Sequence, residues 1–69
     1  MKNEKASNDR VGMYYRTLSD TESAMVFRIK EQGQEFIELI DSLGESDETR
    51  RAKARIEEAV MWSVKHVSS

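Results

Sequence analysis

The sequence predicts an all-α fold: an antiparallel two-helix hairpin with a short N-terminal helix or arm, assembled into a homo-oligomer. Three observations lead to this prediction. Two segments of about 20 residues carry apolar side chains at steps of three and four, which is the period of an amphipathic helix. A short turn containing Gly44 separates them, and the chain has no proline to interrupt either helix. Helices of matched length joined by a short turn pack antiparallel, each about 30 Å long at 1.5 Å per residue.

The N-terminal residues divide into two parts. Residues 1–9 are polar and lack periodicity, so we interpret them as a flexible arm that precedes a hairpin domain at residues 10–69. Apolar and aromatic side chains then begin with Val11 and include Tyr14, Tyr15 and Leu18. This stretch is too short for a stable isolated helix. A short helix and an extended segment that packs on the hairpin both remain open.

The first long helix is predicted to begin after Ser19. Ser19 and Glu22 have the spacing of a capping box, and Gly44 is a natural C-cap. A heptad-like apolar stripe follows, with Gly33 at the place of a missing member. The stripe consists of Met25, Ile29, Phe36, Ile40 and Leu43. Beside it lie Val26 and Ile37, and further out Phe27 and Leu39.

The second long helix is predicted from about Glu48 to about Val67, with either Ser46 or Asp47 as its N-cap. Lys53 and Glu57 are opposite charges four residues apart and should support it locally. Its apolar positions are Ala52, Ile56, Ala59, Val60, Val64 and Val67. In the expected seam, the large residues of the first helix face small ones of the second. These are Phe36, Ile40 and Leu43 against Ala52, Ala59 and Ser63.

Self-association is predicted because the chain lacks other means of stabilisation. A chain of 69 residues buries too little surface to be more than marginally stable alone. It has no cysteine, and its single histidine, His66, cannot form a structural zinc site without several carboxylate partners. Two helices bury only one face each, which leaves Met25, Phe27, Met61 and Trp62 for an interface.

Composition excludes several classes of function. Charged residues make up 35% of the chain with a net charge of only −2, which does not suit non-specific binding to DNA or RNA. The sequence has no apolar run of membrane-spanning length and no signal-peptide pattern, so we expect a cytosolic location. No convergent nucleophile, base or metal-ligand cluster is visible, so we expect neither an enzyme nor a cofactor.

A few residues could contact a ligand, and each has a simpler interpretation. In Tyr14-Tyr15-Arg16 an aromatic ring could stack on a base while the guanidinium binds a phosphate, but the tyrosines could instead pack the N-terminal segment onto the helices. Lys30 could be a solvated charge whose stem covers apolar neighbours. Trp62 and Lys65 share a helix face, where Trp62 could be an oligomer contact. Two sets of basic side chains remain. His66 would be a favourable charge near a helix C-terminus. A basic group early in the second helix could bind an anion or pair with carboxylates. That basic group is Arg50, Arg51 and Arg55.

Several short motifs in order give the chain a family resemblance over roughly residues 10–67. They are Tyr15-Arg16-Thr17-Leu18, Ile29-Lys30 followed by Gly33, Ala52, Glu57-Glu58-Ala59, Met61-Trp62 and Lys65. This pattern resembles the bacteriophage anti-CBASS sponges, which sequester cyclic oligonucleotide immune signals in the host cytoplasm. The hairpin domain is shared with anti-Thoeris sponges, which sequester cyclic ADP-ribose isomers.

The resemblance implies a homo-hexamer that binds cyclic dinucleotides such as cyclic GMP-AMP between protomers, without cleavage. It implies that Tyr15 stacks on a base and that Lys30 contacts the ligand, with Arg16 as a neighbouring contact. Some family members bind cyclic trinucleotides in a separate pocket through an arginine late in the last helix. Lys65 stands at that position here and lacks the planar fork of arginine. A second trinucleotide site therefore stays open.

Other functions remain as alternatives. The chain could be a structural or host-protein interaction module that associates through Met25, Phe27 and Trp62, or a sponge for cyclic ADP-ribose isomers. A phosphodiesterase is a more distant alternative.

Overall fold

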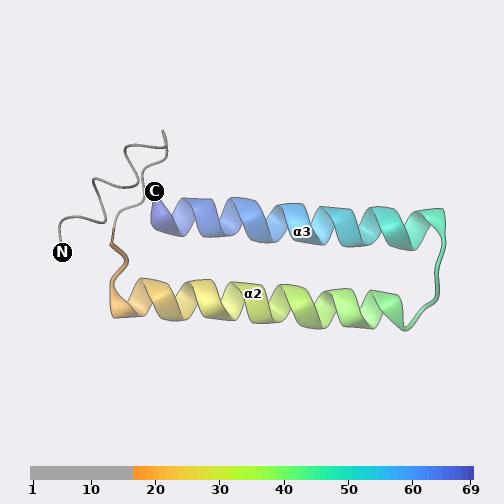
Figure 1. The fold of residues 1–69 in the computed structure, drawn as a ribbon, viewed down its shortest axis with the longest axis horizontal. Helices are drawn as coiled ribbons and strands as arrows, with labels where there is room; N and C mark the ends of the chain where they lie inside the picture. The colour runs from red at the N-terminus through yellow and green to blue at the C-terminus, as the bar shows by residue number, and fades with distance from the viewer. Residues whose placement is uncertain (1–16) are drawn as a thin grey trace.

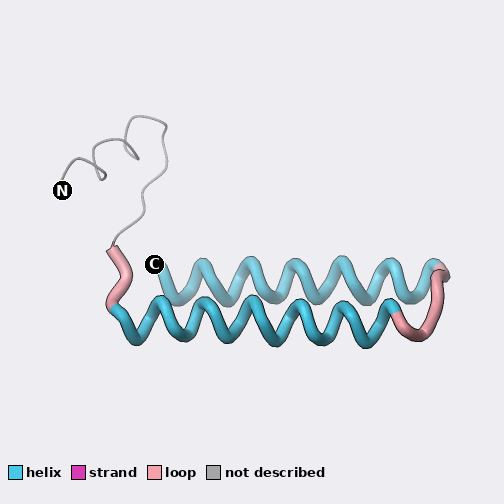
Figure 2. Tube along the Cα trace, turned by 60° about the horizontal axis from the view of Figure 1, so that its bottom comes forward, coloured by secondary structure: helices cyan, strands magenta, loops and turns pink. Residues whose placement is uncertain are grey.

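The computed structural model describes residues 17–69, which form an antiparallel pair of α-helices (Figures 1 and 2). Helix α2 spans Asp20–Asp41 and helix α3 spans Asp47–Ser68, with 22 residues in each. Residues 17–69 contain no strand. The predicted all-α hairpin is therefore confirmed. The predicted arm, Tyr14, Tyr15 and Arg16 lie outside the described residues.

Both helices begin with a serine whose hydroxyl accepts a hydrogen bond from a free amide of the first turn. Ser19 Oγ accepts from the Glu22 amide at 3.1 Å, and Glu22 Oε1 accepts from the Ser19 amide at 3.0 Å, which confirms the predicted capping box. At α3, Ser46 Oγ accepts from the Thr49 amide at 3.0 Å, and Thr49 Oγ1 accepts from the Ser46 amide at 2.9 Å. Ser46 is thus the N-cap of α3, and Asp47 is its first helical residue.

The turn between the helices differs from the prediction in one respect. Ser42, and not Gly44, is the C-cap of α2, and its amide donates to the Glu38 carbonyl at 3.1 Å. Gly44 lies two residues further on with a φ of 112°, a conformation that side-chain-bearing residues rarely adopt. Gly44 therefore reverses the chain inside the turn after the helix has ended.

The two helices approach most closely at Gly33 and Val60. Gly33 is the only fully buried residue among residues 17–69, and a Cβ atom built on it would overlap Val60 Cγ2. The other seam positions are half-buried. They are Val26, Ile29, Ile37 and Ile40 on α2, and Ala52, Ile56, Val60, Val64 and Val67 on α3.

The predicted seam was wrong in its rotation. Met25, Phe36 and Leu43 are 48%, 52% and 70% exposed, while Val26 and Ile37 lie in the seam. On α3, Ala59 and Ser63 are exposed, so they do not oppose the large residues of α2. The reason is the close approach at Gly33, which turns toward α3 the face of α2 that also carries positions 26 and 37.

An ion pair links the helices near the turn. Lys53 Nζ donates to Asp41 Oδ1 at 2.6 Å, so its hydrogen bond crosses the seam, while Glu57, four residues further on, acts on it through its charge alone. The hydrogen bond to Asp41 is the main cause that raises the pKa of Lys53 above its ordinary value. Neither helix of the described chain is long and apolar enough to cross a membrane.

Candidate functional site

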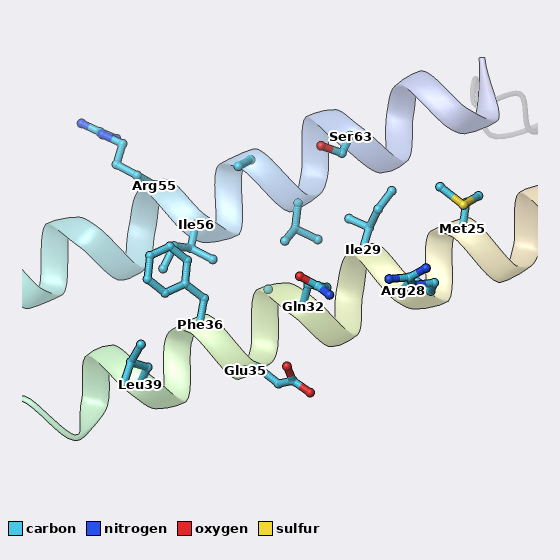
Figure 3. A pocket seen from close by; sticks show the side chains of 13 residues that line it. Met25, Arg28, Ile29, Gln32, Glu35, Phe36, Leu39, Arg55, Ile56 and Ser63 are labelled. Atoms are coloured by element: carbon cyan, nitrogen blue, oxygen red, sulfur yellow. The ribbon is translucent and has the colours of Figure 1, made fainter.

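An open groove of about 860 Å³ runs along one flank of the seam, between α2 and α3 (Figure 3). Its lining is mostly apolar. The residues are Met25, Arg28, Ile29, Gln32, Gly33, Glu35, Phe36, Leu39, Arg55, Ile56, Ala59, Val60 and Ser63. The seam residues among them form its floor, because they are the less exposed ones.

Polar side chains lie along the edges of this groove. Arg28, Gln32 and Glu35 come from α2, and Arg55 comes from α3 (Figure 3). Arg55 lies 3.6 Å from Glu58, whereas Arg28 and Glu35 form no ion pair or hydrogen bond with the described residues. The groove thus offers apolar surface and, at its α2 edge, two charges of opposite sign that are not paired with any residue of 17–69.

Lys30 lies on the other flank of the hairpin. It is exposed and does not line the groove. At 100° per residue, Lys30 follows Ile29 around α2 in the direction away from Met25 and Phe36, beyond the seam residues Val26 and Ile37. Its ammonium has no ion-pair or hydrogen-bond partner among residues 17–69.

Lys65 lies close to the ring of Trp62 on α3. Its Nζ is 6.0 Å from the ring centroid, and the indole Nε1 donates to Glu58 Oε2 at 3.3 Å. The predicted shared face of Trp62 and Lys65 is confirmed. Neither residue lines the groove. Together they present a cation beside a 55% exposed aromatic ring.

Of the basic residues early in α3, Arg50 binds a carboxylate of the turn. The Arg50 guanidinium donates to Glu45 Oε2 at 3.0 Å and also to Asp47, and these hydrogen bonds raise the pKa of Arg50. Arg55 pairs with the Glu58 carboxylate on the same helix, which is one of the two roles that the sequence left open for the basic group. Residues 17–69 contain no group of three or more histidine, aspartate or glutamate side chains that could hold a metal ion.

Comparison with known proteins identifies the hairpin. The family model described as Acb2/Tad1, hairpin domain matches residues 7–68, nearly the whole chain. The chain belongs to the Acb2/Tad1 hairpin-domain family. This is the family of the anti-CBASS and anti-Thoeris phage sponges for cyclic nucleotide signals, so the resemblance noted in the sequence is confirmed. Neither a curated protein nor a solved structure gave a significant match.

The structure of this Acb2/Tad1 hairpin places two of the four predicted ligand residues. Lys30 and Lys65 are both exposed and both outside the groove, while Tyr15 and Arg16 lie outside the described residues. The role of all four stays a prediction. Sequence reasoning missed the groove and its charged edge, although Arg28, Gln32 and Glu35 recur at steps of four and three.

Proposed function

We propose that the protein is a phage anti-defence sponge that binds cyclic oligonucleotide second messengers without cleaving them and so blocks CBASS immunity. The observation that carries this proposal is the match of the sponge hairpin family to residues 7–68. Such a protein acts where the signal is made, in the host cytoplasm.

Cyclic dinucleotides such as cyclic GMP-AMP are the proposed ligands. They carry two phosphates and two purines in a ring, which suits a site built from two copies of one chain. Each copy would supply one Tyr15 to stack on a base, one Lys30 to meet a phosphate, and Arg16 as a further contact. Lys30 is exposed and has no ion pair with residues 17–69, which supports this role because binding a phosphate would break none of the ion pairs in the described part of the chain.

The exposed apolar surface supports self-association, and the homo-hexamer that the family resemblance implies is the proposed assembly. No hydrophobic side chain among residues 17–69 is fully buried. The large exposed ones are Met25, Phe27, Phe36, Leu39, Leu43, Met61 and Trp62. A hairpin with this much apolar surface is expected to bury it against other copies.

Lys65 is the proposed contact for cyclic trinucleotides, if the protein binds them as a second ligand class. Trp62 supports this proposal because an exposed indole beside a cation can stack a base while the ammonium meets a phosphate. Lysine is a point charge, so it binds phosphate with less geometric control than the arginine of other family members.

We propose sequestration and not catalysis, because lowering the free signal requires only tight binding. The test is calorimetric titration of the purified protein with cyclic GMP-AMP, other cyclic dinucleotides, cyclic trinucleotides and cyclic ADP-ribose isomers. Recovery of intact ligand after denaturation of the complex is expected. Turnover of the ligand over hours would show a phosphodiesterase instead.

Two variants test whether ligand binding in this titration depends on Lys30. Lys30→Ala should weaken cyclic dinucleotide binding at least about tenfold, because a charge-assisted contact is lost. Arg51→Ala is the matched control, since Arg51 is also an exposed cation without an ion pair among the described residues. Absence of binding to every ligand at high micromolar concentration would contradict the proposal.

The exposed side chains of Phe27, Met61 and Trp62 favour a second candidate, a module that docks on a host protein. Tyr15→Ala separates the two functions. In a sponge this change abolishes ligand binding and leaves the oligomer intact, whereas in a structural module it weakens assembly.

A further inference from the structure

One stripe of exposed side chains on α2 has nearly the same spacing on both sides of Gln32. Five exposed residues along the groove recur at steps of three, four, three and four. They are Met25, Arg28, Gln32, Glu35 and Leu39. Figure 3 shows them following one another along α2. Alternating steps of three and four place all five side chains on one face of α2, where they can contact a second helix together.

The two halves of this stripe are complementary to each other. Met25 and Leu39 lie seven residues on either side of Gln32, and both are large apolar side chains, 48% and 60% exposed. Arg28 lies four residues before Gln32 and Glu35 three residues after it, with opposite charges. Neither charge has a partner among the described residues.

If a second copy of α2 packed antiparallel against this stripe, its apolar side chains would face apolar ones and its charges would face opposite charges. A two-fold axis at Gln32 brings Met25 of each copy to Leu39 of the other, and Arg28 of each copy to Glu35 of the other. The contact would extend over about 21 Å, at 1.5 Å per residue. An unrelated partner would not require a pattern that complements itself.

We propose that α2 pairs antiparallel with α2 of a second copy through this stripe, with reciprocal ion pairs between Arg28 and Glu35. The pairing rests on the self-association described under the proposed function and assigns it a surface and a register. It uses the groove flank, so it leaves the flank that carries Lys30 open.

Charge reversal tests this register. Arg28→Glu places four carboxylates around the axis, and Glu35→Arg places four cations there. Each variant alone should associate at least about tenfold more weakly than the native chain, since like charges opposed across an interface repel. A one-to-one mixture should recover association, because the introduced carboxylate of one variant then faces the introduced guanidinium of the other, and the remaining native Arg28 and Glu35 face each other. The controls are Arg51→Glu and Glu31→Arg, which make the same changes at exposed positions outside the groove.

The measurement is native mass by sedimentation and mass spectrometry without any cyclic nucleotide, with helicity followed by circular dichroism. Association of the single variants at native strength, or a mixture that fails to recover association or helicity, overturns the pairing. The ligand titration is independent of this result. Ligand binding without the charge dependence refutes the pairing alone, and charge-dependent association without ligand binding refutes the sponge alone.

Discussion

The Lys53 ammonium lies 2.6 Å from the Asp41 carboxylate and joins the second turn of α3 to the last residue of α2. Asp41 is the main cause of the raised pKa of Lys53, and Glu57 is a minor one. The ion pair therefore stabilises the folded hairpin in the form where Lys53 is protonated. It does so across the seam, close to the turn.

The contribution of this ion pair should depend on pH in one direction. Because folding raises the pKa of Lys53, the contribution is fully present below its ordinary value of 10.5 and is lost as pH rises through the folded value. Asp41→Asn should lower Tm at neutral pH. The difference in Tm from the native chain should shrink above the pKa that Lys53 has in the folded protein. Thermal melts at fixed protein concentration measure it, with Glu57→Gln as control. An equal Tm change for both variants would contradict the assignment.

Gly33→Ala should destabilise the hairpin in spite of the higher helix propensity of alanine. Its Cβ would overlap Val60 Cγ2, and valine is too stiff at χ1 to move aside freely. Overpacking of this kind costs about 1–3 kcal/mol, against a propensity gain of about 1 kcal/mol. Urea unfolding at fixed protein concentration measures the change. Val60→Ala should relieve the overlap in the double variant, and Gln34→Ala, at an exposed position of the same helix, is the control. A stabilised Gly33→Ala chain would show that the helices are further apart.

Ser46→Ala should lower the free energy of unfolding by about 1 kcal/mol, because it removes the acceptor for the Thr49 amide. Ser46→Asp should retain most of the stability, since aspartate is an equally good N-cap. Ser63→Ala is the control at an exposed serine in the interior of α3. Equal stability of all three variants would indicate that α3 begins elsewhere.

Gly44→Ala should also be destabilising, by about 1–2 kcal/mol, because alanine is strained in the left-handed region that Gly44 occupies. Nothing lies within 4 Å of the position where its Cβ would be, so any loss reflects the backbone and not a clash. Gly44→Asn should be milder, since asparagine tolerates this conformation better. The reverse order of the two variants in urea unfolding would refute the turn geometry.

Lys65→Arg tests the proposed trinucleotide contact. Arginine supplies a planar fork of donors that lysine lacks, so binding of cyclic trinucleotides should strengthen several-fold. Binding of cyclic dinucleotides through Lys30 should not change. Calorimetry with one ligand of each class measures both effects. A parallel change for both ligands would indicate that Lys30 and Lys65 serve the same site.

Local features of the hairpin could be predicted from the sequence, and features that depend on register could not. Ser19 with Glu22 specifies a helix start within four residues, so the capping box could be predicted directly. The partner of Lys53 could not, because Glu57 is one turn away on the same helix while Asp41 is brought near only by the turn and the pairing of the helices.

The rotation of α2 shows the same limit. Met25, Ile29, Phe36 and Ile40 fit a helical period as well as Val26, Ile29, Ile37 and Ile40 do, and the choice depends on Gly33 meeting Val60. The sequence determines the candidate site even less than it determines the rotation of α2. Family resemblance pointed to Lys30 and Lys65, and periodicity alone gives neither of them a ligand.

The turn that follows α2 also bears on how fast the chain folds. Only residues 42–46 separate the two helices, so the first contacts across the seam, such as Asp41 with Lys53, close a very short loop. Closing such a loop costs little chain entropy, and topologies dominated by near neighbours in sequence fold on the microsecond to millisecond scale. The hairpin can therefore form quickly within one chain, and association with other copies would then cover the apolar surface that a single hairpin leaves exposed.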